Sequence, residues 1–265
     1  MWTVRTRLTR SRLFTILGLA GSTVLRLWRY ARPYFASGVP MPLLWAALAM
    51  TGSQPAEADV RDFPFTYEWY QNSKGERELA YHSAYLQQSN AYIHEIEFEY
   101  GVTSRFSVAP YIVFKHGNGR SLHYDGVKLE TRYKLGNFKP NRVLAGLYLE
   151  LEQANREAIE LEGKLIFSQY DRHGGNISLN LILHRQFGSG DKLEPAYSFG
   201  IARSVKDDVR GGVEWLHDIN TGRINAGPVV SFNVGNIHVA TGYAFPVNRN
   251  AGNKGELRLL AEHHF

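Results

Sequence analysis

The side chains best suited to chemistry are charged residues that recur at every second position. Glutamates do so in 95–99, and three bases and one acid do so in 128–134. In an extended chain, residues two apart point to the same side. Such a face predicts either the polar lining of a conduit or a set of cross-strand ion pairs. The residues that we assign to this face are Glu95, Glu97, Glu99, Lys115, Lys128, Glu130, Arg132, Lys134, Glu150, Glu152, Glu160, Glu162, Lys164, Arg210, Glu214, Glu256, Arg258 and Glu262.

A second candidate for chemistry is the stretch Lys115-His116-Gly117-Asn118-Gly119-Arg120-Ser121. It resembles the His-x-Ser-Asn-Gly-Arg-Ser stretch of the outer-membrane phospholipase A family, in which His activates the first Ser as a nucleophile. Here Gly117 directly precedes Asn118, so the residue equivalent to that Ser is missing. We therefore expect an extracellular Gly-Asn-Gly turn and assign no catalytic residue. A lipid hydrolase acting near His116 is kept as an alternative.

The sequence contains no pattern that is typical of metal binding, thiol chemistry or phosphate binding. The chain has no Cys, so thiolate ligands, disulfides and a Cys nucleophile are excluded. The ten His are scattered, and His263 and His264 would point to opposite faces of a strand. No Gly-x-Gly-x-x-Gly precedes a helix. We therefore expect no metal site and no cofactor.

The basic character of the chain is confined to its N-terminus. Residues 1–58 hold seven Arg, no Lys and a single acid, Glu57, whereas the remainder has a net charge of −1. Since the basic charge lies in this one segment, we do not expect nucleic acid as a partner.

That segment has the order of a secretory signal. Arg-rich sequence comes first, an apolar run follows at 41–50, and Ala56-Glu57-Ala58 matches a small-x-small cleavage site. We predict a leader over 1–58 that is cleaved near Ala58, which exports the rest. The earlier apolar stretch 13–20 leaves open the alternative that the start codon is assigned too early and adds an extra leader segment. A membrane anchor is the alternative, although neither apolar run reaches the ~20 residues of a spanning helix.

The exported part alternates between apolar and polar residues with period two, which predicts β-strands. Turn signals such as Gly136-Asn137 and Gly235-Asn236 separate the segments. Twelve strands are predicted between 77 and 265, at about 77–88, 92–100, 106–116, 127–135, 143–151, 159–167, 177–183, 192–204, 208–218, 224–234, 237–247 and 256–265.

Residues 63–71 also alternate and would make a thirteenth strand. Because single-chain bacterial barrels have even strand numbers, we interpret 59–76 as an N-terminal extension. We expect 59–73 to lie in the periplasm or in the barrel mouth, with the barrel itself over 77–265.

Period two alone fits a soluble sandwich as well as a membrane barrel. Three features favour an all-β, transmembrane, antiparallel up-and-down barrel: the export signal, the chain end at Phe265 on an alternating strand, and aromatic residues near the strand ends. In this arrangement Leu129, Leu149, Leu161 and Leu181 face lipid and the glutamates face the lumen. The expected lipid-facing girdles comprise Tyr100, Phe106, Tyr133, Phe167 and Phe265 at one rim, and Phe114, Tyr124, Trp215 and Phe245 at the other.

Two hairpins carry a family resemblance. Residues 97–108, Glu-Phe-Glu-Tyr-Gly-Val-Thr-Ser-Arg-Phe-Ser-Val, resemble the E-Y-G-L-T-D-R-L-x-L hairpin of the putative meta-pathway phenol-degradation family, and 198–213 resembles a second copy. The resemblance covers about 90–265 and implies a transport-like outer-membrane barrel. The terminal Phe265 resembles the signal read by the barrel-assembly machinery, although His263 stands where an aromatic or aliphatic residue is usual.

These patterns predict an outer-membrane channel or uptake protein, not an enzyme, for small and aromatic or apolar solutes. Outer-membrane lipid and the assembly machinery are its expected partners. A structural barrel with a salt-bridged, closed lumen is the other alternative. Counting back from the C-terminus places the turns 102–105, 136–141, 170–175, 205–208 and 235–236 in the periplasm. The loops near 88–91, 117–121, 153–157, 188–191, 219–223 and 248–254 are expected outside the cell.

Overall fold

The computed structural model describes residues 61–117, 119–154, 158–188, 192–206, 208–248 and 254–265. The predicted leader, 1–58, lies outside these residues. Within them the chain forms twelve strands, each overlapping a predicted segment, although β4 begins seven residues earlier than predicted and β7 ends three residues later. Their bounds are β1 Arg77–Leu86, β2 Ala91–Gly101, β3 Phe106–Gly117, β4 Arg120–Lys134, β5 Val143–Ala154, β6 Ile159–Tyr170, β7 Gly175–Gln186, β8 Leu193–Lys206, β9 Val209–Asp218, β10 Arg223–Val234, β11 Ile237–Pro246 and β12 Glu256–His264.

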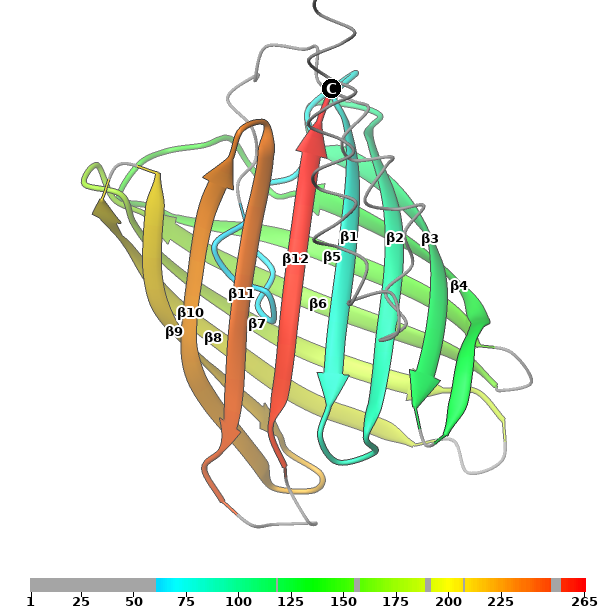
Figure 1. The fold of residues 1–265 in the computed structure, drawn as a ribbon. Helices are drawn as coiled ribbons and strands as arrows, with labels where there is room; N and C mark the ends of the chain where they lie inside the picture. Colours follow the sequence, from blue (N-terminus) through cyan, green and yellow to red (C-terminus); the bar gives the residue numbers. More distant parts are fainter. Residues whose placement is uncertain (1–60, 118, 155–157, 189–191, 207, 249–253) are drawn as a thin grey trace, which may run out of the picture. The chain divides into compact units, whose positions relative to one another are not determined.

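The strands close into one antiparallel barrel (Figure 1). Each strand pairs with its neighbours in sequence, and β1 pairs with β12 from Glu78↔His264 to Leu86↔Glu256. Closure leaves no strand edge with unpaired backbone groups, which is the condition for a sheet that crosses a bilayer. The predicted all-β barrel of about twelve strands is confirmed.

The barrel carries its apolar side chains on the outside. Leu129, Leu149 and Leu181 are 45%, 48% and 45% exposed, and Leu161 is half-buried. On the same strands as the first two, Glu130 and Glu150 point inward and are buried. The predicted girdle residues are all exposed or half-buried: Tyr100, Phe106, Phe114, Tyr124, Tyr133, Phe167, Trp215, Phe245 and Phe265.

The connections fall at two ends of the barrel. The turns predicted to be periplasmic lie at the end that carries Phe265, here the C-terminal end, and the other connections lie at the opposite, loop end (Figure 1). In the turn after β6, the backbone N–H groups of Gly175 and His173 donate to Asp171 and hold the pKa of that carboxyl below its usual range. Which end faces the cell exterior stays a prediction. No helix among the described residues is long and apolar enough to cross a membrane.

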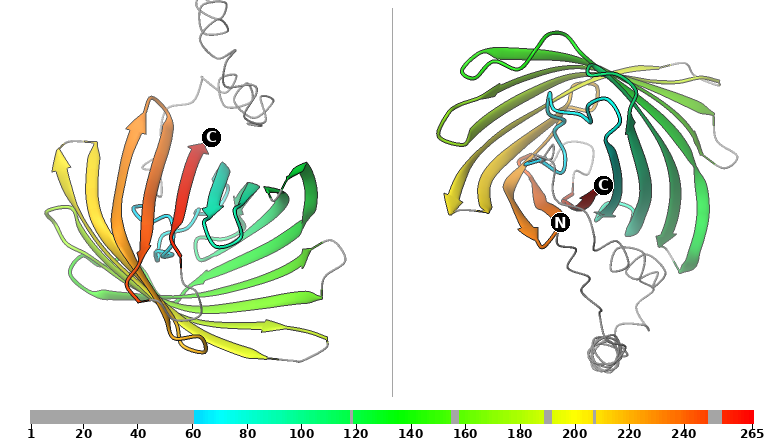
Figure 2. Two further views of the ribbon diagram at one scale, coloured as in Figure 1. Left: turned by 60° about the horizontal axis from the view of Figure 1, so that its bottom comes forward. Right: turned by 90° about the horizontal axis from the view of Figure 1, so that it is seen from above.

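Residues 61–73, here called the plug, lie inside the barrel (Figure 2). They form no strand despite their alternating sequence, and most of their side chains are buried. The structure therefore revises the expected place of this segment, since it reaches mid-barrel and not only the mouth. Small residues on the wall make room for it. A Cβ added at Gly200 would lie 2.8 Å from the Phe63 ring, and one at Gly101 would overlap the Ser73 carbonyl.

Closure predicts resistance to detergent. Unboiled in detergent, the purified protein is expected to migrate in electrophoresis as a compact species, and to shift after boiling, because unfolding must break the closed backbone ladder. The measurement is heat-modifiable migration. An unshifted band together with recovery in the soluble fraction would contradict the membrane barrel.

Candidate functional site

The first residues of the plug are tied to the wall through the carboxylate of Asp62. Arg210 donates to it through both Nε and Nη2, the latter at 2.8 Å. Asn176 Nδ2 donates at 2.8 Å and Ser231 Oγ at 3.1 Å. Three strands, β7, β9 and β10, thus hold one buried carboxylate, which makes Asp62 the strongest anchor of the plug.

The middle of the plug is held through its backbone. Tyr67 N donates to Asn180 Oδ1 at 2.7 Å, and Asn180 Nδ2 donates back to Tyr67 O at 2.8 Å. Trp69 N donates to Ser168 Oγ at 2.9 Å. Buried backbone groups need hydrogen-bond partners, and here inward-facing side chains supply them in place of a neighbouring strand.

Basic side chains bind the carbonyl oxygens of the plug's second half. Arg132 Nη2 donates to Glu68 O at 2.6 Å and also to Tyr70 O. Lys134 Nζ donates to Gln71 O at 2.8 Å. Two residues of the predicted charged face, both on β4, therefore hold the plug in place, and Lys134 also borders the cavity at the C-terminal end.

Carboxylates of the wall and of the plug accept three further N–H groups. Phe65 N donates to Glu214 Oε1 at 3.2 Å, and Asn72 N donates to Glu99 Oε1 at 3.1 Å. Within the plug, Asp62 N donates to Glu68 Oε1 at 2.5 Å. The plug is bound along its whole length, so its position is specific.

A cavity lies on each side of the plug. The cavity at the loop end has a volume of about 480 Å³ and is bordered by Phe65 and Tyr67 of the plug. The cavity at the C-terminal end has a volume of about 620 Å³ and is bordered by Trp69 and Tyr70. The plug therefore separates two spaces in a lumen that is not filled by the wall alone.

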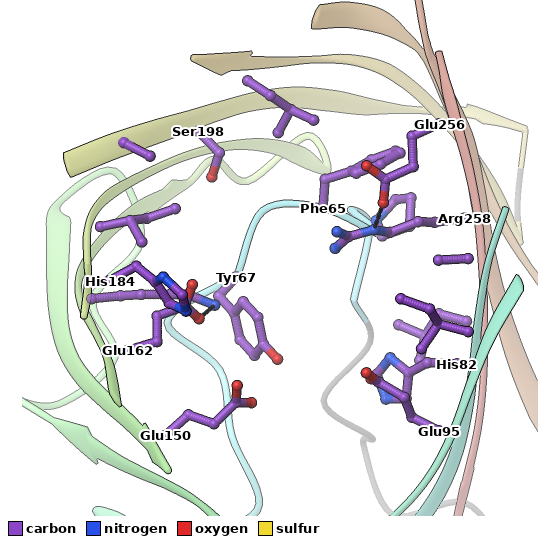
Figure 3. Close-up of a pocket in the computed structure, with 18 of the residues that line it drawn as sticks. Phe65, Tyr67, His82, Glu95, Glu150, Glu162, His184, Ser198, Glu256 and Arg258 are labelled. Atoms are coloured by element: carbon purple, nitrogen blue, oxygen red, sulfur yellow. Dashed lines mark hydrogen bonds and ion pairs between the residues drawn. The ribbon is translucent and has the colours of Figure 1, made fainter. Parts of the chain in front are cut away.

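The loop-end cavity has a cluster of carboxylates on β2 and β5 (Figure 3). Lys128 Nζ lies 3.0 Å from Glu95 Oε1, 3.1 Å from Glu152 Oε2 and 3.6 Å from Glu150 Oε1. Tyr148 also donates to Glu150, at 2.8 Å. One ammonium group thus serves three carboxylates, which leaves this part of the wall with excess negative charge.

Elsewhere in the same cavity, acids and bases are matched in pairs. Glu162 lies 2.8 Å from Lys164, and Glu256 lies 2.6 Å from Arg258 (Figure 3). The Lys164 ammonium also lies over the Tyr67 ring, 3.8 Å from its centroid. Such cation–π contacts are attractive and bind the plug to the wall.

The predicted charged-face residues are all buried or half-buried, and several form pairs that the sequence did not assign. Lys115 contacts Asp125 at 3.3 Å near the loop end. Glu160 contacts His184 at 3.0 Å. Glu262 lies 3.9 Å from Arg61 of the plug. The charged face thus divides into plug contacts, ion pairs and cavity wall.

Three carboxylates come together near the C-terminal end. Ligand atoms of Glu78, Glu97 and Glu99 lie within 4.8 Å of one another, a grouping that could hold a cation. Each also has a partner: His82 at 2.7 Å from Glu97, Arg132 at 3.7 Å from Glu99, and His264 at 3.5 Å from Glu78. The contacts describe an ion-pair network, and Glu78, which lies on β1, is a member that sequence reasoning missed.

The structure places His116 on the outer face of the barrel. Its ring stacks on Tyr92, with 4.6 Å between centroids, and on His94 at 5.4 Å. Among the contacts of the described residues, none joins His116 to Ser121. The nucleophile–base geometry that a lipid hydrolase needs is therefore not assembled at this stretch.

Several functional side chains escaped sequence reasoning because they are uncharged or lie in the plug. Asp62 and Glu68 belong to a segment that was predicted to lie in the periplasm or in the barrel mouth. Asn176, Ser178 and Asn180 alternate with the apolar residues of β7, and all three are fully buried. Buried amides and hydroxyls in a row on a lumen face were the available signal for a bound polypeptide.

The comparisons with known proteins agree with the fold. No family model matches the chain, and no curated protein matches it in sequence. Its structure is similar to the KdgM porin in complex with disordered oligogalacturonate, with a TM-score of 0.54, 9% identity, and coverage of 72% of this chain and 99% of that one.

Two further solved structures are similar. The NanC porin gives a TM-score of 0.50 at 11% identity, with coverage of 70% of this chain and 98% of that one. An outer membrane channel from Pseudomonas putida F1 gives 0.53 at 13% identity, with coverage of 77% and 100%. These identities show the fold alone, which is that of outer-membrane porins.

The anchor at Asp62 yields a prediction. Asp62→Asn is expected to loosen the plug, because the guanidinium of Arg210 loses its charged acceptor, at a cost of about 1–3 kcal/mol. The measurement is acrylamide quenching of Trp69, which is 4% exposed, in a Trp215→Phe protein that starts at Asp59. The quenching constant should rise.

Asp208→Asn is the matched control, since this acid lies in an exposed turn at the C-terminal end. It removes the same charge without touching the plug. Equal quenching in both variants would show that Asp62 does not hold the plug.

Proposed function

We propose that this protein is an outer-membrane channel for small solutes, and that residues 61–73 keep it closed at rest. The observation that carries the proposal is a charged lumen with a cavity on each side of a non-strand segment. A barrel of twelve strands has more interior than its own side chains fill. A purely structural barrel would need no second element and would retain no such spaces.

The chemistry of the wall limits the solute. Charged and aromatic groups border the loop-end cavity, which suits small solutes that carry both a polar and an aromatic part. The KdgM structure was obtained with an oligogalacturonate, which is a polyanion. The three carboxylates around Lys128 argue against a polyanion as the solute here.

The apolar exterior supports placement of the barrel in the outer membrane. Exposed apolar side chains follow the length of the strands and would contact acyl chains. Aromatic side chains lie near both ends of the barrel. Recognition of Phe265 by the barrel-assembly machinery belongs to the same proposal. Export through a leader cleaved near Ala58 is a further part of it.

The gating part of the proposal is tested by crowding the plug. Gly200→Val should push against the Phe63 ring, because an added Cβ already comes within 3 Å of it. We expect single-channel recordings of this variant to show a several-fold higher open probability than the unmodified protein. Gly163→Val is the control, since the nearest atom to a Cβ there is the Tyr148 carbonyl oxygen, at 4.0 Å.

A disulfide tests the same idea in reverse. The chain has no Cys, so Phe63→Cys combined with Gly200→Cys creates a single possible bridge between plug and wall. The oxidised protein should stay closed, and reductant should restore openings. A lack of conductance in every variant, with heat-modifiable folding intact, would refute the channel and favour the closed structural barrel.

A further inference from the structure

We propose that the loop-end cavity is a binding site for a small organic cation, an ammonium or amidinium compound with an aromatic or apolar body. The inference rests on the proposed channel function and names the class of solute. It follows from the charge, the aromatic surface and one unused hydroxyl of this cavity.

The charge argument concerns Lys128 and its surroundings. Glu95, Glu150 and Glu152 surround its ammonium at 3.0–3.6 Å, which leaves two negative charges if all four groups are ionised. Like charges in a low-dielectric space repel strongly unless a cation lies between them. A solute ammonium group would relieve this repulsion.

The other charges of the cavity do not cancel this excess. Glu162 is matched by Lys164 and Glu256 by Arg258, each within 3 Å. The lining as a whole holds six acids and four Lys or Arg residues. Arg61 of the plug is one of these bases and lies 3.9 Å from Glu262, so an anionic solute would meet this one base against an excess of two carboxylates. The wall therefore discriminates between solutes by the sign of their charge, and repulsion of anions is part of its specificity.

Aromatic rings form the floor of the cavity. Phe65 and Tyr67 of the plug reach into it (Figure 3). The protein already sets its own cations against these rings, with Arg258 over Phe65 at 4.8 Å and Lys164 over Tyr67 at 3.8 Å. Arg61 also lies over Tyr67, 4.3 Å from its centroid. These rings therefore attract positive charge, and the aromatic body of a solute would pack against the same aromatic surface.

One hydroxyl points into the cavity without a partner. Ser198 is 1% exposed, borders the cavity, and its Oγ has no hydrogen-bond partner among the described residues. Figure 3 shows this oxygen directed into the space. A buried polar atom without a partner is costly, so it points to a ligand that supplies a hydrogen bond. A volume of about 480 Å³ is within the range of small-molecule sites.

The test uses two probes of equal size and opposite charge, benzylammonium and benzoate. Calorimetric titration of the detergent-solubilised, full-length barrel is expected to show benzylammonium binding at least tenfold tighter than benzoate. Glu152→Gln, at the most exposed of the three carboxylates, should weaken benzylammonium about tenfold. Ser198→Ala should weaken it by a smaller factor.

Asp208→Asn is again the matched control and should leave the affinity unchanged. Heat-modifiable migration checks that each variant is folded. Benzoate binding as tightly as benzylammonium, or equal affinities in Glu152→Gln and Asp208→Asn, would overturn the inference. Conductance recordings decide the channel separately: binding without any current in Gly200→Val would remove the channel function and leave the site.

Discussion

The structure depends on one constraint, the need of every backbone N–H and C=O within a bilayer for a partner inside the protein. Pairing of β1 with β12 meets it for the strands. Once the barrel is closed, the alternation of each strand decides which side chains meet lipid. Apolar residues occupy the lipid-facing side of each strand. The charged residues that alternate with them therefore point into the narrow lumen, where most of them need a partner of opposite charge or a hydrogen bond.

The plug meets the same constraint by different means. Its backbone has no neighbouring strand, and its groups are satisfied by side chains from β4, β6 and β7. Asn180 imitates a strand partner by donating to and accepting from Tyr67. Wall and plug are therefore complementary polar surfaces, and each satisfies groups that the other would leave unpaired. These contacts are separate side-chain hydrogen bonds that water can replace one after another, which makes such an element more easily displaced than a strand.

Period-two alternation made the strands predictable, because lipid outside and charge inside impose it on every one of them. The bounds of β2, β3 and β10, for example, differ by at most one residue from those predicted. The plug was not predictable in the same way. Phe65, Tyr67 and Trp69 alternate as a strand would, and their partners, such as Asn180 and Ser168, lie about a hundred residues away in sequence.

The sequence indicated which residues lie on the charged face, but not which of them contact one another. Lys128 contacts three carboxylates from two different strands, and this depends on barrel curvature and cross-strand register. Asp62 and Arg210 are 148 residues apart, and nothing local indicates that they meet. Alternation gives the direction of each side chain, whereas the tertiary structure decides which of them meet.

The distribution of charge along the lumen follows from these contacts. Towards the C-terminal end, Arg132, Lys134 and Arg210 are engaged with carbonyl and carboxylate oxygens of the plug. At the loop end, the carboxylates around Lys128 exceed the bases. Displacement of the plug would withdraw oxygen acceptors from the first group and leave the second unchanged. Near the C-terminal end, Glu78, Glu97 and Glu99 are matched by His264, His82 and Arg132, so that part of the lumen does not repeat the excess of acid found at the loop end. A cation entering at the loop end would therefore be attracted most strongly there. With the plug in place, the same excess of acid around Lys128 would hold a cation in the loop-end cavity, which joins the binding site and the gate in one arrangement of charges.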